Sequence, residues 1–472
     1  MIDIKHGDCL DVMRGMEENR IDFIVTDPPY GLHFMGKGWD KFKFKKSNKN
    51  ETGGRPGDLT NNKISDSDGS FKAGTYDENR NDEFQEFMRL FGIEALRVLK
   101  PGGMLAMFGA PRRHHRQMSG LEDAGFEIRD VIAWMFGQGF PKSLDISKAI
   151  DKAKGCEREV IGIDKDFQRR NPNGKWGIAA EGYGGVKKIT KEKHELSKTF
   201  SGYGTALKPA YEPIIICMKP LDGTFAQNAE KWGIAGINVD TSRIEGNKPD
   251  TIRGAGGQNG RYGPINAQGK IIDDGKGRWP SNLILSEESA EELDQMTGVS
   301  QSSRVDNSTA TKTCGFHDSL GRERKPRTDV GGYKDSGGAS RFFYCAKASS
   351  SERNRGLEGL PLKNKGEIDG SNCDNTLKGP GNSLHPDKNS KMQNFHPTVK
   401  PIALMKYILK LLAPPGNPIC LDPFAGSGST LVAAKELGIS CIGIEKEEEY
   451  INIAKARVEN AEFKPEQMEI SI

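Results

Sequence analysis

Apolar runs and helical patterns alternate at both ends of this 472-residue chain. Residues 21–25 form a nearly continuous apolar run, which predicts a strand covered on both faces in a parallel sheet. Residues 82–100 carry apolar side chains at helical spacing and predict a helix that the Pro-Gly-Gly segment 101–103 ends. Further strands are predicted at 2–8, 104–110, 126–136 and 211–220. This alternation is typical of an α/β domain.

The alternation breaks down in the middle of the chain and returns near the C-terminus. Residues 221–395 contain short apolar islands separated by Gly, Ser, Asn and Lys, so we expect a different domain there. Residues 399–412 predict an amphipathic helix with Pro401 in its first turn. Residues 417–459 then follow the order strand, glycine loop, helix, strand, helix. The glycine content also predicts long polar loops, because 57 glycines in 472 residues are well above the average glycine usage of about 7%.

Charge and cysteine content restrict the class of protein. The net charge of +3 is too small to establish a polyanionic partner, so local basic segments matter more than the sum. The eight cysteines contain no CxxC pair, which argues against a zinc ribbon or a disulfide framework, and no metal site is expected. No apolar run is long enough to span a bilayer and the start lacks a signal-peptide pattern. We expect a cytoplasmic protein without a membrane partner.

A glycine loop near the C-terminus predicts a nucleoside-binding site. The segment LDPFAGSGS, residues 421–429, follows an apolar run and precedes a helical pattern. Gly426 and Gly428 permit close approach of the backbone, and Glu445 follows the next predicted strand, which is the ribose-binding arrangement of Rossmann-like folds. The loop lacks the lysine of a Walker-type phosphate loop, and Asp422 would repel a pyrophosphate. S-adenosyl-L-methionine has the required ribose and cationic groups; a simple tight turn is the alternative.

A second acidic segment, IVTDPPYGL at residues 24–32, contains the end of the apolar run that begins at residue 21. Pro28 and Pro29 fix two φ angles and leave nearby carbonyl groups free. The Asp27 carboxylate and a carbonyl are two acceptors for the two hydrogens of an exocyclic amine. They would stabilise the positive charge that grows on the amine as it attacks a methyl group, and Tyr30 can stack on the base. A rigid turn with a surface tyrosine is the alternative interpretation.

Together, TDPPY and DPFAGSGS resemble the amino-methyltransferases of DNA, in the motif order of the beta class. The resemblance implies a circularly permuted, Rossmann-like methyltransferase fold of the α/β class that uses S-adenosyl-L-methionine, with an inserted loop-rich target-recognition domain. It divides the chain into a catalytic half at 1–220 with long loop insertions at 40–81 and 150–205, a target-recognition domain at 221–395, and a cofactor-binding half at 396–472.

The resemblance also implies site residues. The target amine and ring would be held by Asp27, Pro28, Pro29 and Tyr30. The cofactor would be held by Asp8, Asp422, Pro423, Phe424, Ala425, Gly426, Gly428 and Glu445, and near its methionine end by His396, Thr398 and Lys400 of the HPTVKP segment. The strand ending at Asp422 is expected beside the strand ending at Asp27, so that both ends of the chain build one site.

Two basic segments are candidates for contact with double-stranded DNA. Chemistry on a base requires flipping it out of the duplex, with phosphate contacts and aromatic surfaces to receive the strand. The segment 37–49 offers Trp39, Lys41, Lys43, Lys45 and Lys46, and the cluster at 321–327 offers Arg322 and Arg324. Phe34 and Trp39 are alternatives to Tyr30 for stacking. A solvated loop and an exposed linker are the alternative interpretations of the two segments.

The leading hypothesis is site-specific methylation of adenine N6 in DNA. Adenine is favoured because cytosine-N4 members of the family more often have Ser where Asp27 stands, and cytosine-C5 chemistry is excluded because no Pro-Cys pair occurs. Methylation of cytosine N4, a cofactor-binding DNA-binding module without turnover, and an RNA or protein amine as substrate stay open. So do the target sequence, a homodimer, and a cognate restriction endonuclease as opposed to an orphan methylase of a bacterium or phage.

Overall fold

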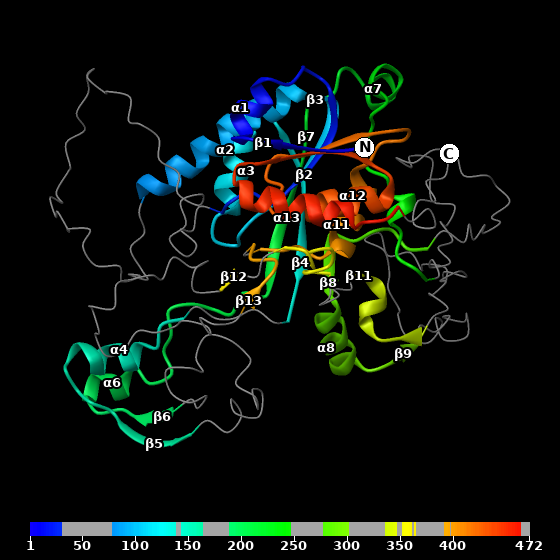
Figure 1. Ribbon diagram of the computed structural model, residues 1–472. Coiled ribbons are helices and arrows are strands. Elements are labelled where there is room, and N and C mark those ends of the chain that lie inside the picture. Colours follow the sequence, from blue (N-terminus) through cyan, green and yellow to red (C-terminus); the bar gives the residue numbers. More distant parts are fainter. Residues whose placement is uncertain are drawn as a thin grey trace, which may run out of the picture.

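The computed structural model describes residues 1–30, 78–137, 143–163, 188–246, 277–301, 336–346, 352–360, 363–364, 391–396 and 398–463. A nine-stranded sheet forms the centre of these residues (Figure 1), in the order β1-β15-β14-β2-β3-β7-β4-β8-β11. Strand β7 runs antiparallel to its neighbours β3 and β4, and the other neighbouring strands run parallel. The strands span β1 Ile2–His6, β2 Ile21–Thr26, β3 Leu99–Phe108, β4 Glu127–Met135, β7 Tyr211–Met218, β8 Leu283–Ser286, β11 Tyr344–Ala346, β14 Ile419–Asp422 and β15 Ser440–Glu445.

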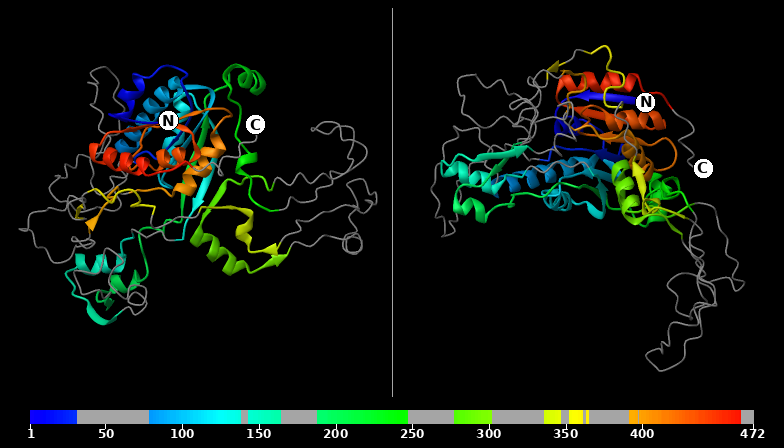
Figure 2. Two further views of the ribbon diagram at one scale, coloured as in Figure 1. Left: turned by 45° about the vertical axis from the view of Figure 1, so that its right-hand side comes forward. Right: turned by 90° about the horizontal axis from the view of Figure 1, so that it is seen from below.

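Helices cover both faces of this sheet (Figures 1 and 2). Phe23 and Val25 pack in the hydrophobic cluster on one face, whereas Ile21 and Ile24 pack in the cluster on the other, as expected for a strand buried on both sides. The first cluster includes α11 (Ile402–Leu412), α12 (Ser429–Leu437) and α13 (Glu448–Glu459); the second includes α1 (Cys9–Arg14), α2 (Glu78–Val98) and α3 (His114–Ala124). The expected α/β architecture is confirmed.

The two ends of the chain meet in the middle of the sheet. Strand β14 pairs in parallel with β2, with Cys420 opposite Phe23 and Leu421 opposite Ile24. Their carboxyl ends, Thr26 and Asp422, therefore lie at the same edge of the sheet. This confirms the expected neighbourhood of the two strands, and it is the edge where α/β folds bind ligands.

Two local predictions are wrong in detail. The segment 101–103 lies inside β3 rather than in a turn, because α2 ends at Val98 and β3 begins at Leu99. The ladder with β2 absorbs this segment as an irregularity, and Gly102 takes a φ of 74°, which favours glycine. Pro401 is the N-cap of α11 and not part of its first turn, because its ψ of 135° is extended.

Segments from the middle of the chain also join the central sheet. Strands β8 and β11, which come from residues 221–395, extend it beyond β4, so the described part of that segment is continuous with the sheet. The division of the chain at 220 and 395 stays a prediction. Residues 143–163 and 188–205 form a small lobe at the lower left of Figure 1, built from α4 (Ile146–Ala153), β5 (Glu159–Ile163), β6 (Lys188–Lys191) and α6 (Glu195–Thr199).

The remaining helices and strands of the described residues are not part of the central sheet. They are α7 (Phe225–Trp232), η3 (Asp240–Ser242), α8 (Glu287–Thr297), β9 (Ser300–Gln301), β10 (Ser336–Gly337), η4 (Ala339–Phe342), β12 (Lys363–Asn364) and β13 (Lys391–Met392). Among the described residues, no helix combines the length and the apolar character needed to cross a membrane.

Candidate active site

Asp27 lies at the carboxyl end of β2, where the buried strand gives way to the Pro-Pro turn. Its side chain is 16% exposed, and its Oδ1 atom accepts a 2.7 Å hydrogen bond from the hydroxyl of Tyr30. Burial, together with the Asp27 carboxylate, raises the pKa of Tyr30 well above its ordinary value, so the phenol stays a donor. The turn thus holds a carboxylate and an aromatic ring in a fixed relation, as the sequence suggested.

Lys400 reaches the same carboxylate from the segment that precedes α11. Its Nζ atom lies 2.9 Å from Oδ2 of Asp27, 3.2 Å from the hydroxyl of Tyr30 and 3.0 Å from Oε2 of Glu212. Burial alone would lower the pKa of Lys400, but the carboxylates of Asp27 and Glu212 outweigh it and raise that pKa well above its ordinary value. The ammonium is therefore charged and lies among Asp27, Tyr30 and Glu212. Its role toward the methionine end of a cofactor stays a prediction.

Glu212, near the start of β7, was not identified from the sequence. It sits between Tyr211 and Pro213 in an otherwise apolar strand, and an isolated carboxylate there was the available signal. Its contact with Lys400 depends on β7 being inserted antiparallel between β3 and β4, which no local pattern encodes.

A buried hydrogen bond joins the two motif-bearing strands. The hydroxyl of Thr26 donates to Oδ1 of Asp422 over 2.6 Å, and the backbone N–H of Phe424 donates to the same oxygen over 3.2 Å. Burial raises the pKa of Asp422 to about 6, although hydrogen bonds from Thr26 and Thr430 oppose the rise. With 2% of its surface exposed, Asp422 organises the start of the loop from within.

The glycine loop runs from Asp422 to the start of α12. Gly426 and Gly428 have φ angles of 52° and 79°, which explains why glycine occupies both positions. Glu445, at the end of β15, accepts hydrogen bonds of 2.8 Å from the backbone N–H groups of Gly426 and Glu447, one on each oxygen. A carboxylate has about four lone-pair positions, so acceptor capacity is left for two adjacent hydroxyl groups. Pro423, Phe424 and Ala425 complete the loop between Asp422 and Gly426.

His396 and Thr398 lie against this loop. The Nδ1 atom of His396 is 2.8 Å from the carbonyl oxygen of Thr398, and a carbonyl only accepts, so Nδ1 carries the proton. Burial lowers the pKa of His396 to about 4, which leaves the ring neutral at pH 7. A Cβ added to Gly426 would lie 2.7 Å from Nε2 of His396, so the imidazole closes directly over the loop. Tyr450 packs edge-on against the ring at 4.6 Å between centroids.

Asp8 lies on the far side of Glu445, because β1 and β15 pair in parallel with His6 opposite Glu445. Its Oδ1 atom caps α1 by accepting from the N–H of Leu10 over 3.0 Å, and its Oδ2 atom is 3.3 Å from Nζ of Lys446. The structure therefore gathers the expected amine-binding and cofactor-binding residues at one edge of the sheet. Their roles stay predictions. The DNA-contact candidates Trp39, Lys41, Lys43, Lys45, Lys46, Arg322 and Arg324, and also Phe34, lie outside the described residues.

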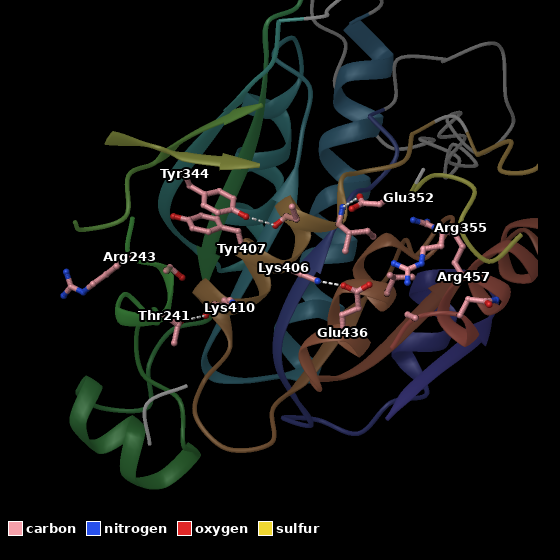
Figure 3. A pocket seen from close by; sticks show the side chains of 16 residues that line it. Thr241, Arg243, Tyr344, Glu352, Arg355, Lys406, Tyr407, Lys410, Glu436 and Arg457 are labelled. Atoms are coloured by element: carbon pink, nitrogen blue, oxygen red, sulfur yellow. Dashed lines mark hydrogen bonds and ion pairs between the residues drawn. The ribbon is translucent and has the colours of Figure 1, made fainter. Parts of the chain in front are cut away.

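A cavity of about 540 Å³ lies beside α11 and α12 (Figure 3). Tyr344 and Tyr407 stack there with 4.0 Å between ring centroids, and Lys406 forms an ion pair with Glu436. None of the amine-binding or cofactor-binding candidates lines this cavity.

Comparison with known proteins places the chain among DNA methyltransferases. The chain is 46% identical over 71 residues to the Type II methyltransferase M2.LlaDCHI of Lactococcus lactis subsp. cremoris. It is 47% identical over 72 residues to the Type II methyltransferase M2.DpnII of Streptococcus pneumoniae. Each match covers 15% of this chain and 26% of the relative, so the chain spans about a quarter of their length.

Solved structures resemble the chain only remotely. The M1.HpyAVI complex with SAM is 14% identical, with a TM-score of 0.33 over 97% of this chain and 100% of that one. The cytosine-N4-specific PvuII DNA methyltransferase is 12% identical, with a TM-score of 0.39 over 97% and 86%. These scores are too low to support further argument. A family profile described as DNA methylase, in contrast, matches residues 21–456 and so includes both motif segments. The chain belongs to the N6/N4 DNA methylase family.

Proposed function

We propose that this protein transfers the methyl group of S-adenosyl-L-methionine to the N6 amine of adenine in double-stranded DNA. The observation that carries the proposal is the hydrogen bond between Thr26 and Asp422, which holds the TDPPY turn and the glycine loop side by side at one sheet edge. An amine bound by the first segment and a methyl donor bound by the second would be adjacent, and such orientation lowers the barrier to transfer.

The amine side of the site supplies acceptors. The Asp27 carboxylate and a carbonyl of the Pro-Pro turn accept the two N–H groups of the amine, while Tyr30 offers a ring to the base. Charge grows on the nitrogen as it attacks, and acceptors fixed beforehand in a partly buried site stabilise that charge more than water does. The base enters after flipping out of the duplex, because its amine is otherwise paired and stacked.

The described residues fit the cofactor. Glu445 has acceptor capacity for two ribose hydroxyls, and Gly426, without a Cβ, leaves room at the loop that His396 covers. Asp422 and the positively polarised N-terminus of α12 lie beneath that loop, and Asp8 would contact the adenine edge of the bound cofactor. When bound, S-adenosyl-L-methionine supplies an activated methyl group, and it is the methyl donor of this family.

The choice of adenine rests on Asp27, because cytosine-N4 members of the family more often have Ser there. The cytosine amine presents the same two hydrogens, so N4 methylation is the second candidate. The test is to incubate the purified full chain with unmethylated DNA and S-adenosyl-L-methionine, digest the DNA to nucleosides and identify the methylated base by mass spectrometry. N6-methyladenine supports the proposal; N4-methylcytosine keeps the mechanism and overturns the base.

Two further measurements separate the remaining alternatives. Competition between DNA, RNA and protein substrates identifies the acceptor, and bound cofactor without any product would indicate a binding module. The Asp27→Ala protein should lose activity by about 100-fold or more, because one fixed acceptor for the developing charge is gone. Asp11→Ala, which removes an exposed carboxylate on α1, is the matched control and should methylate at the normal rate.

A further inference from the structure

Three charged groups meet beside the Pro-Pro turn. The ammonium of Lys400 lies 2.9 Å from Oδ2 of Asp27 and 3.0 Å from Oε2 of Glu212, and the Lys400 side chain is only 7% exposed. That Glu212 oxygen is buried and accepts no other hydrogen bond from the described residues. Asp27 and Glu212 come from the ends of different strands, so the two carboxylates hold the ammonium from two sides. The sum of the three formal charges is −1.

In this arrangement Lys400 and a target amine would compete for the carboxylate of Asp27, and Glu212 can relieve that competition. In the structure Lys400 donates to the Asp27 carboxylate, which is the group that must accept from a target amine. The amine nitrogen would carry positive charge from the moment it bonds to the methyl carbon, as the bond from that carbon to the sulfonium sulfur breaks and leaves neutral S-adenosylhomocysteine, until the nitrogen releases a proton to water. An ammonium paired with Asp27 alone would cancel the negative charge that should face this nitrogen.

We propose that Glu212 is a positioning residue, which keeps Lys400 paired while Asp27 turns to the target amine and so leaves the cluster with one net negative charge. This inference rests on the proposed function. The buried ammonium needs a carboxylate partner at all times, because an unpaired charge in such a site is costly. Glu212 meets that need without leaving β7, and the Asp27 carboxylate stays available to the reacting nitrogen.

The inference predicts that the charge of Lys400 affects how the rate of methyl transfer depends on pH. The titratable groups that face it are Asp27, Tyr30 and Glu212, with the neutral ring of His396 nearby. In Glu212→Gln one of the two carboxylates that raise the pKa of Lys400 is gone, so its ammonium releases the proton at lower pH. The cluster charge then returns from 0 to −1 as the pH rises. The rate of this variant should therefore increase in alkaline solution, where the wild-type rate stays level.

The experiment measures single-turnover methyl transfer to DNA across pH for wild type, Glu212→Gln, Glu212→Gln/Lys400→Met and the control Glu127→Gln. Glu127 is an exposed carboxylate at the opposite end of β4 from the strand-end site. We expect Glu212→Gln to be about 100-fold slower at neutral pH, with unchanged affinity for S-adenosyl-L-methionine. Removing the ammonium in the double variant should restore the rate by about tenfold, a coupling typical of residues in contact.

Each outcome of this experiment either supports or overturns the inference. A slow Glu212→Gln enzyme that recovers with alkaline pH or with the second substitution supports the inference. A normal rate in Glu212→Gln overturns it, and so does a slow rate that neither change improves, because Glu212 would then serve folding alone. Wild-type protein that binds the cofactor but yields no methylated base overturns the proposed function itself, and the inference with it.

Discussion

The hydroxyl of Thr26 donates a 2.6 Å hydrogen bond to the carboxylate of Asp422, across 396 positions of the chain. Both residues end buried strands, and both precede the segments on which the proposed chemistry depends. The TDPPY turn and the glycine loop are thus joined by strand pairing and by a hydrogen bond inside the sheet.

Replacing Thr26 with Val should destabilise the protein by about 1.5–3 kcal/mol, the usual contribution of a hydrogen bond to a charged group. Valine keeps the shape of the side chain but leaves a buried Asp422 oxygen with one donor fewer. Urea unfolding of the two proteins measures the difference. In Thr199→Val, the control, the hydroxyl lost is exposed and donates to the carbonyl of Glu195 within α6, so we expect a change below about 0.5 kcal/mol. Equal effects in both variants would contradict the role of the junction.

Asp422 should make stability depend on pH in an unusual direction. Burial raises its pKa from 3.8 to about 6, so the folded state holds the proton more tightly than the unfolded chain does. Its contribution to stability is therefore fully present below the unfolded pKa and is lost as the pH rises through about 6. Relative to Asp422→Asn, wild type should lose about 2–3 kcal/mol of unfolding free energy between about pH 4 and about pH 7. A pH-independent difference between the two proteins would refute this account.

The parts of the site that sequence could predict are those that local pattern encodes. Asp27 and Asp422 each end a nearly continuous apolar run, and in a parallel sheet such runs end at one edge. Glycines with positive φ follow Asp422 because the loop turns sharply onto α12, and Glu445 follows from its spacing.

The parts that sequence could not predict depend on tertiary placement. Glu212 became part of the site only because β7 is inserted between β3 and β4, which puts the start of β7 at the strand-end edge. Lys400 was expected near the cofactor because its HPTVKP segment resembles a cofactor motif, yet its long side chain reaches across to Asp27. A carboxylate or ammonium can reach several ångströms from its backbone, so spacing along the chain does not determine which pocket it enters.

Glu445→Gln should weaken binding of S-adenosyl-L-methionine by about tenfold or more, the loss expected when a charged hydrogen-bond acceptor is removed. The neutral amide keeps a single acceptor oxygen, and its NH₂ group would face the backbone N–H of Gly426 or Glu447. Isothermal titration calorimetry measures the affinity. Glu448→Gln, on the first turn of α13, is the matched control and should bind normally.

The ribose role of Glu445 can be separated from its effect on the loop. In wild type, a cofactor analogue without the ribose hydroxyls should bind more weakly than S-adenosyl-L-methionine. In Glu445→Gln this preference should largely disappear, because the carboxylate that accepts from the hydroxyls is gone. An undiminished preference in the variant would assign the ribose to other groups.

Gly426→Ala should disturb the cofactor loop in two ways at once. Alanine at a φ of 52° costs about 1–2 kcal/mol in the left-handed region, and its Cβ would lie 2.7 Å from Nε2 of the neutral His396 ring. The ring cannot withdraw freely, because its Nδ1 atom donates a hydrogen bond to the carbonyl of Thr398 and the Tyr450 ring packs edge-on against it. We therefore expect both lower stability and weaker cofactor binding, measured by thermal unfolding with and without S-adenosyl-L-methionine.

Gly233→Ala isolates the backbone part of this effect. Gly233 ends α7 with a φ of 72°, and a Cβ there would meet no atom within 4 Å. The control should lose about 1 kcal/mol of stability from backbone strain alone and keep its affinity for the cofactor. The additional loss in Gly426→Ala then measures the contact between the loop and His396. If both variants lost the same stability and bound S-adenosyl-L-methionine equally well, His396 would not be closing over the loop, and its placement at the cofactor would have to be abandoned.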